Sequence, residues 1–103
     1  MGKTIALLGA LDTKGAEYAF VKKCIEARGH NTLLIDVGIM EPMLSPDIPA
    51  TEVAKAGGAE LAALAARQDR GQAVAAMTRG VTALLPKLHA EGRFDAVIAL
   101  GGS

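Results

Sequence analysis

The chain has 103 residues, of which eleven are basic and eleven acidic, so its formal net charge is zero. That balance leaves no electrostatic footprint for direct nucleic-acid binding or for attachment to an anionic membrane. The three aromatic side chains (Tyr18, Phe20 and Phe94) are too few for a base-stacking platform, and the length predicts one small domain, residues 1–103.

The numbers and positions of cysteine and histidine argue against disulfide bonds and metal sites. The single cysteine, Cys24, falls in a helical pattern, so we predict a small buried side chain in a reducing compartment. His30 and His89 are too far apart in the sequence for a metal-ligand spacing. The sequence has no signal-peptide core and no apolar run of membrane-spanning length. We therefore expect a cytoplasmic protein with no membrane partner.

The first stretch combines an apolar run with a polar turn. Residues 5–8 predict a strand that is covered on both faces, Gly9 ends it, and a helical pattern begins near Gly15. Asp12 and Thr13 are candidate N-caps for that helix. The free N–H groups of a first helical turn, together with the helix dipole, favour anions. The turn is therefore a candidate phosphate site, although the same residues would also suit an ordinary helix start.

Neither of the common phosphate-binding motifs is present in this turn. A P-loop requires its lysine after the second glycine, whereas Lys14 precedes Gly15. The dinucleotide fingerprint fails because the segment 9–11 lacks a second glycine. The strand–turn–helix is by itself a weak signal for phosphate.

The next elements complete a βαβ unit. Residues 15–28 predict a helix with Tyr18, Val21 and Ile25 on one face, and Gly29 is a plausible residue just after its end. A second apolar strand follows and ends at Asp36; a right-handed crossover places it beside the first. An acid at this position often accepts hydrogen bonds from ribose hydroxyls. The alternative for Asp36 is a solvated carboxylate at the start of a loop.

The segment 37–50 predicts a long irregular connection. Pro42, Pro46 and Pro49 exclude a helix there and discourage a regular strand. Apolar residues lie between the prolines, and a loop of this length is more often functional than filler. We interpret it as an ordered apolar loop, a lid or a partner contact; alternatively its apolar residues cover one side of the sheet.

A helical region follows the loop. A helix is predicted from Thr51 to the glycines at 57–58 and resumes over 59–66. Asp69 is a candidate N-cap for a longer helix that ends near Ala90, and Pro86 is predicted to kink or split it. The face predicted to be buried consists of Val74, Met77, Val81, Leu84, Leu85 and Leu88.

The last stretch repeats the pattern of the first. Residues 95–100 form a third apolar run, again typical of a strand buried in a parallel sheet. Gly101, Gly102 and Ser103 follow at once, and such a sequence is typical of a second phosphate-handling turn, since glycine lets backbone N–H groups approach a ligand. The alternative is a flexible terminus or a cloning scar.

Four segments occur in order along the chain: LLGALDTKGAE at 7–17, DVG at 36–38, DRGQAVAAM at 69–77 and ALGGS at 99–103. Together they resemble the ATP-binding N-terminal domain of the tomato mosaic virus resistance protein and its uncharacterised bacterial and fungal relatives. The resemblance covers the whole chain and departs at Ala10, where the family usually has threonine. It implies a Rossmann-like fold and ATP binding, with the chain forming the first part of a nucleotide-binding domain that continues after Ser103.

We therefore predict an α/β, Rossmann-like three-layer domain with a short parallel sheet in the order 2-1-3 and flanking helices, an incomplete half of a larger domain. In this hypothesis Lys14 and the first-turn N–H groups bind the phosphates of ATP, Asp36 binds ribose, and the terminal glycines and serine add backbone donors. The predicted ATP-binding residues are Gly9, Leu11, Asp12, Thr13, Lys14, Gly15, Asp36, Gly101, Gly102 and Ser103.

Two other classes of function stay open at this point. One is a Mg²⁺-dependent phosphoryl- or acyl-transfer enzyme or hydrolase that uses Asp12, Asp36 and Asp69, although no nucleophile–base pair is visible. The other is an oligomerisation or interaction subdomain, because a three-stranded sheet has two open edges. On this ground we expect a homo-oligomer.

Overall fold

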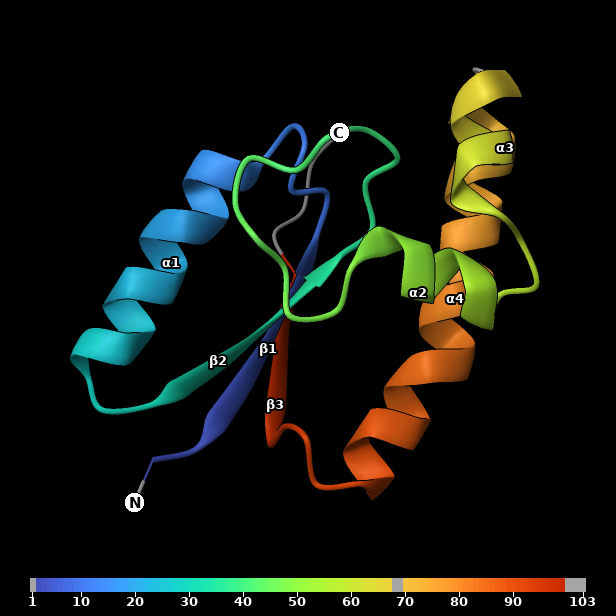
Figure 1. Ribbon diagram of the computed structural model, residues 1–103. Helices are drawn as coiled ribbons and strands as arrows, with labels where there is room; N and C mark the ends of the chain where they lie inside the picture. Colours follow the sequence, from blue (N-terminus) through green and yellow to red (C-terminus); the bar gives the residue numbers. More distant parts are fainter. Residues whose placement is uncertain (1, 68–69, 100–103) are drawn as a thin grey trace.

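The computed structural model describes residues 2–67 and 70–99, and its centre is an all-parallel sheet of three strands (Figure 1). The strands are β1 (Thr4–Gly9), β2 (Asn31–Asp36) and β3 (Ala96–Ala99), in the order β2-β1-β3. Leu7 of β1 pairs with Leu34 of β2 on one side and with Ile98 of β3 on the other. The predicted α/β class and the order 2-1-3 are confirmed.

Helices flank the sheet on both faces. The helices are α1 (Gly15–Ala27), α2 (Ala50–Ala56), α3 (Leu61–Arg67) and α4 (Arg70–Ala90). Figure 1 shows α1 on one side of the sheet and α2, α3 and α4 on the other. Because successive side chains of a strand point to opposite faces, β1 divides its residues between two cores. Leu7 packs with Tyr18 under α1, whereas Ala6 packs with Val53 and Met77.

The buried face of α1 agrees with its predicted stripe, with one correction. Tyr18 is fully buried, and Val21 and Ile25 are partly buried against the same cluster. Gly29 has a φ of +85°, as expected of a residue that ends a helix in the left-handed region. The prediction that Cys24 is buried is wrong, since the structure leaves it exposed. One residue is about 100° of helix rotation, so Cys24 lies beside the stripe rather than on it.

The long helix α4 also departs from its predicted face. Met77 and Leu88 are buried as expected, but Val74 is 58% exposed and the alanines Ala73 and Ala76 are buried instead. Small side chains suffice here because α2 approaches α4 very closely. The helix continues through Pro86 to Ala90, so of the two predicted outcomes, a kink or a split, the split is wrong.

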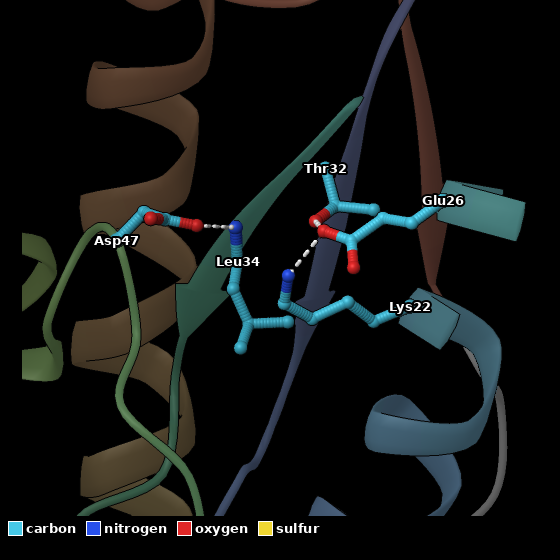
Figure 2. A network of polar contacts seen from close by, with 5 residues as sticks. All are labelled: Lys22, Glu26, Thr32, Leu34 and Asp47. Atoms are coloured by element: carbon cyan, nitrogen blue, oxygen red, sulfur yellow. Dashed lines mark hydrogen bonds and ion pairs between the residues drawn. The ribbon is translucent and has the colours of Figure 1, made fainter. Parts of the chain in front are cut away.

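The proline-rich connection, residues 37–49, returns to the sheet and covers the outer edge of β2. The N–H of Leu34 donates to Oδ2 of Asp47 at 2.7 Å, and the carbonyl of Leu34 accepts from the N–H groups of Asp47 and Ile48. Ile48 forms an isolated parallel bridge with Ile35. Figure 2 shows Asp47 pointing at Leu34. In the same view Glu26 forms an ion pair with Lys22 and accepts a hydrogen bond from the hydroxyl of Thr32. The connection therefore covers an edge of the sheet. Our alternative, in which its apolar residues cover one side of the sheet, is confirmed in part, because Ile48 is buried in the same core as Ala6.

The third strand is not buried as its sequence predicts. All four residues of β3 are exposed, whereas residues 33–36 of β2 are all buried. The reason is that no helix or further strand among the described residues lies over β3. The predicted N-cap Asp69 and the predicted turn at 101–103 fall outside the described residues.

Candidate functional site

The candidate site lies at the carboxyl ends of β1 and β2. Gly9 pairs with Asp36 at this edge, so the two turns that follow these strands begin side by side. Gly9 itself lies against the buried ring of Tyr18: a Cβ added at Gly9 would be only 2.2 Å from Tyr18 Cζ. The strand end can approach α1 this closely only because the residue is glycine.

The turn after β1 differs in detail from the prediction. The N-cap of α1 is Lys14, with no capping hydrogen bond from its side chain, so the N-cap assignment to Asp12 or Thr13 is wrong. Instead the N–H groups of Thr13 and Lys14 donate to the carbonyl of Ala10, at 3.3 and 2.8 Å. Asp12 is directed elsewhere, since its Oδ2 accepts from the N–H of Met40 at 3.2 Å.

The first turn of α1 presents backbone donors next to this loop. Among the described residues, no acceptor is bonded to the N–H groups of Gly15, Ala16 or Glu17. The side chain of Met43 lies against this end of the helix, so close that a Cβ added at Gly15 would be 2.5 Å from Met43 Cβ. The N–H of Met43 also donates to the carbonyl of Leu11 at 3.0 Å. The proline-rich connection thus passes over the turn; that it opens and closes as a lid stays a prediction.

Asp36 joins the turns after β1 and β2. Its side chain is 1% exposed, and its Oδ1 accepts from the N–H of Leu11 at 3.1 Å and of Gly38 at 2.9 Å. Burial raises the pKa of Asp36 above its ordinary value and outweighs these two hydrogen bonds, which lower it, while the charge of Asp12 raises it further. Asp12 lies on the other side of Gly38, where an added Cβ would be 2.4 Å from Asp12 Oδ1.

These turns and α4 enclose a cleft of about 420 Å³, which we call the site cleft. It is lined by Ala10, Asp12, Thr13, Val37, Gly38, Ile39, Met40, Ala65, Ala73 and Val74. Its volume falls within the usual range for small-molecule sites, and most of its lining side chains are apolar. Asp12 and Thr13 are its ionisable and hydroxyl groups.

The structure brings together most of the residues predicted from the sequence. Asp12 and Thr13 line the site cleft, Lys14 and Gly15 lie where α1 begins, and Leu11 and Asp36 are buried beneath the turn. Of the remaining predicted residues, Gly9 ends β1, whereas Gly101, Gly102 and Ser103 lie outside the described residues. Whether these residues contact ATP stays a prediction.

Sequence reasoning missed most of the residues that line the cleft, among them Gly38, Ile39 and Met40 after β2 and Ala73 and Val74 on α4. A signal was available for part of it. Gly38 belongs to the segment DVG, and Ala73 and Val74 belong to DRGQAVAAM, two segments that carried the family resemblance. Nothing in the sequence pattern indicated that these segments meet.

Among the described residues, no group of three His, Cys, Asp or Glu side chains is placed to hold a metal ion. Asp36 is buried and uses Oδ1 for two backbone N–H groups. Asp12 Oδ1 is buried against Gly38 and has no hydrogen-bond partner among the described residues, so a cation reaches it only if the Gly38 loop moves. Asp69, the third carboxylate of the predicted enzyme, lies outside the described residues.

Comparison with known proteins places the chain in a family. Residues 3–103 match the model of the uncharacterised protein family (UPF0261) N-terminal domain. The chain belongs to this family. It is 43% identical to the UPF0261 protein of Clostridium tetani. The match covers 100% of this chain and 26% of that relative. It is 37% identical to a UPF0261 protein of Rhizobium meliloti, over 97% of this chain and 24% of the relative, and 38% identical to one of Brucella suis, over 96% and 24%.

The chain thus spans about a quarter of the length of the curated relatives it matches. No solved structure matches it significantly. The names of these UPF0261 proteins state no ligand and no activity, so the ATP binding implied by the resemblance stays a prediction. Among the described residues of this UPF0261 domain, no helix is long and apolar enough to cross a membrane.

Proposed function

We propose that this UPF0261 domain binds ATP at the carboxyl ends of β1 and β2. The observation that carries the proposal is the juxtaposition of the site cleft with the unbonded N–H groups at the start of α1. In open parallel sheets, ligands bind beyond the carboxyl ends of the strands, where neighbouring strands connect to opposite faces. Here β1 leads to α1 on one face of the sheet, and its neighbour β2 leads to α2, α3 and α4 on the other, so the sheet has such a point between β1 and β2.

Each part of the nucleotide has a chemical counterpart in the proposed site. The phosphates would lie at the start of α1, where free backbone donors and the helix dipole favour negative charge. Lys14, the N-cap residue, would add a cationic contact to them. The base would occupy the apolar part of the site cleft, beside Val37, Ile39 and Val74.

Asp36 has two separable roles in this proposal. Through Oδ1 it holds the turns after β1 and β2 together, which shapes the cleft. Its other oxygen, Oδ2, would accept from a ribose hydroxyl, as the sequence predicts. Reaching that oxygen requires the cleft to open slightly, because Asp36 is almost fully buried. Phosphate at the start of α1 would also displace the exposed side chain of Met43 from Gly15.

Isothermal titration of ATP into the full-length protein tests the proposal, with Lys14→Ala as the diagnostic variant. Losing a charge-assisted contact of about 1.5–3 kcal/mol should weaken ATP binding roughly tenfold to a hundredfold. The free variant should melt at the same temperature or slightly higher, because a lysine at the start of a helix opposes the dipole.

Lys23→Ala is the matched control, since Lys23 is exposed on the same helix and away from the turn. It should leave both ATP affinity and melting temperature unchanged. Absence of heat with wild-type protein would show that ATP is not the ligand. Equal affinity for ATP in wild type and Lys14→Ala would retain ATP but remove Lys14 from the site.

A further inference from the structure

The two edges of the sheet differ in how they are covered. The outer edge of β2 is closed by the chain itself, through the hydrogen bonds of Asp47 and Ile48 to Leu34. β3 pairs with β1 on its inner side, and no described residue pairs with its outer side. A parallel strand with a bare outer edge is a ready template for a further strand.

The side chains of β3 are of the kind found in buried strands, although the strand is exposed. Val97 and Ile98 are 41% and 37% exposed, and as neighbours in a strand they point to opposite faces of the sheet. Both faces of β3 therefore carry apolar side chains that are partly exposed. Strands with apolar residues on both faces belong to parallel sheets that are covered on both sides, as β2 is here.

An apolar groove of about 420 Å³ adjoins β3 on the side of the sheet that carries α4. Its lining residues are Leu8, Ala10, Val37, Val74, Met77, Thr78, Val81 and Thr82. Leu8 pairs with Ala99, so the groove begins next to the end of β3. Val74 lies at the groove and is one of the most exposed large apolar side chains among the described residues.

We propose that a βα unit from the full-length polypeptide, outside residues 1–103, docks on this surface. Its strand pairs with the outer edge of β3, and its helix packs in the part of the groove formed by residues 77–82 of α4, away from Val37 and Val74, which the groove shares with the site cleft. Parallel strands are joined by right-handed crossovers, and one that continues outward from β3 places its helix on the face that already carries α4. The relatives are about four times as long as this chain, and the family model that the chain matches describes an N-terminal domain, so the relatives have enough further sequence for this unit.

The first test replaces Val97 by lysine in the full-length protein. If the proposed unit covers β3, Val97→Lys puts a charge into an apolar interface and should lower the melting temperature by about 5 °C or more. The matched control is Phe20→Lys on α1, where the side chain is 68% exposed and the helix lies on the opposite face of the sheet from α4 and the groove; it should change the melting temperature by no more than about 1 °C. Equal, small effects of the two substitutions would overturn the proposal.

A second measurement needs no variant and decides the matter if Val97→Lys fails to fold. Hydrogen exchange of the 95–99 segment in full-length wild-type protein should be slow at every protein concentration, because the covering strand is in the same chain. Rapid exchange of this segment would overturn the proposal. Protection that falls on dilution, together with a monomer–dimer equilibrium in sedimentation, would also overturn it and would assign the surface to a second copy.

Discussion

Asp36 is the residue whose interpretation the structure changes most. A sequence with an acid at the end of the second strand predicts an exposed ligand group, and the structure shows a buried carboxylate that braces two turns. The Leu11 and Gly38 donors come from either side of Asp36 in the sequence, so one side chain determines the relative position of both turns. The shape of the site cleft depends on this brace, whatever the cleft binds.

The raised pKa of Asp36 predicts a pH-dependent contribution to stability. Because its pKa in the folded protein exceeds the ordinary value of 3.8, the contribution is fully present below that value and is lost as the pH rises through the raised pKa. Asp36→Asn keeps an acceptor for Leu11 and Gly38 but cannot titrate. The unfolding free energy of wild type minus that of Asp36→Asn should therefore fall with rising pH in this window, as urea melts from about pH 3 to about pH 7 would show. A difference independent of pH would contradict the assigned cause.

At the scale of elements, α2 and α4 cross where one glycine lies in α4 and another directly follows α2. A Cβ on Gly80 of α4 would be 1.9 Å from the carbonyl oxygen of Val53, and a Cβ on Gly57, just after α2, would be 2.7 Å from the carbonyl oxygen of Ala76. The obstructing atoms are backbone, which cannot turn aside as a side chain can. Because the helix backbones are so close here, the small side chains of Ala73 and Ala76 are enough to fill the interface along the first half of α4.

Two effects of opposite sign compete in Gly80→Ala, and the crossing decides between them. Alanine is a better helix former than glycine by about 1 kcal/mol, so propensity alone predicts stabilisation. The clash with Val53 forces the helices apart, and we expect a net destabilisation of about 1–3 kcal/mol in chemical denaturation. Ala83→Gly, at an exposed position of the same helix, measures the propensity term and should cost about 1 kcal/mol. If Gly80→Ala proves more stable than wild type, the helices do not cross this closely.

At the scale of the whole molecule, Asp47 closes one edge of the sheet. Its Oδ2 is the acceptor for the N–H of Leu34, a group that would otherwise face outward from an edge strand. Asp47→Ala should destabilise the protein by roughly 1–3 kcal/mol, because the partly buried N–H loses its partner. It should also increase self-association, detectable by light scattering at rising concentration. Asp47→Asn retains an acceptor oxygen and should behave close to wild type; equal behaviour of wild type and Asp47→Ala would show that the backbone hydrogen bonds of residues 47 and 48 are enough to close the edge.

Local patterns determined the elements of this UPF0261 domain and their order. Apolar runs and glycine or proline breaks placed the three strands and the helices to within a few residues, and the right-handed crossover rule placed the second strand beside the first. The full order 2-1-3 was predicted only together with the Rossmann-like resemblance. These signals work because they depend on residues close together in the chain. The glycine after α1 and the turn after β1 were predictable for the same reason.

Only the tertiary structure decided which groups are buried, bonded or exposed. Asp36 bonds Leu11 across 25 positions of sequence and Asp12 bonds Met40 across 28, so neither contact is visible in a local pattern. The bond to Met40 draws Asp12 away from the N-cap position, and the glycine crossing buries alanines of α4 while Val74 stays exposed. Periodicity predicts that a face is apolar, whereas its burial depends on whether another element is near enough to cover it, as β2 and β3 show with similar sequences and opposite exposure.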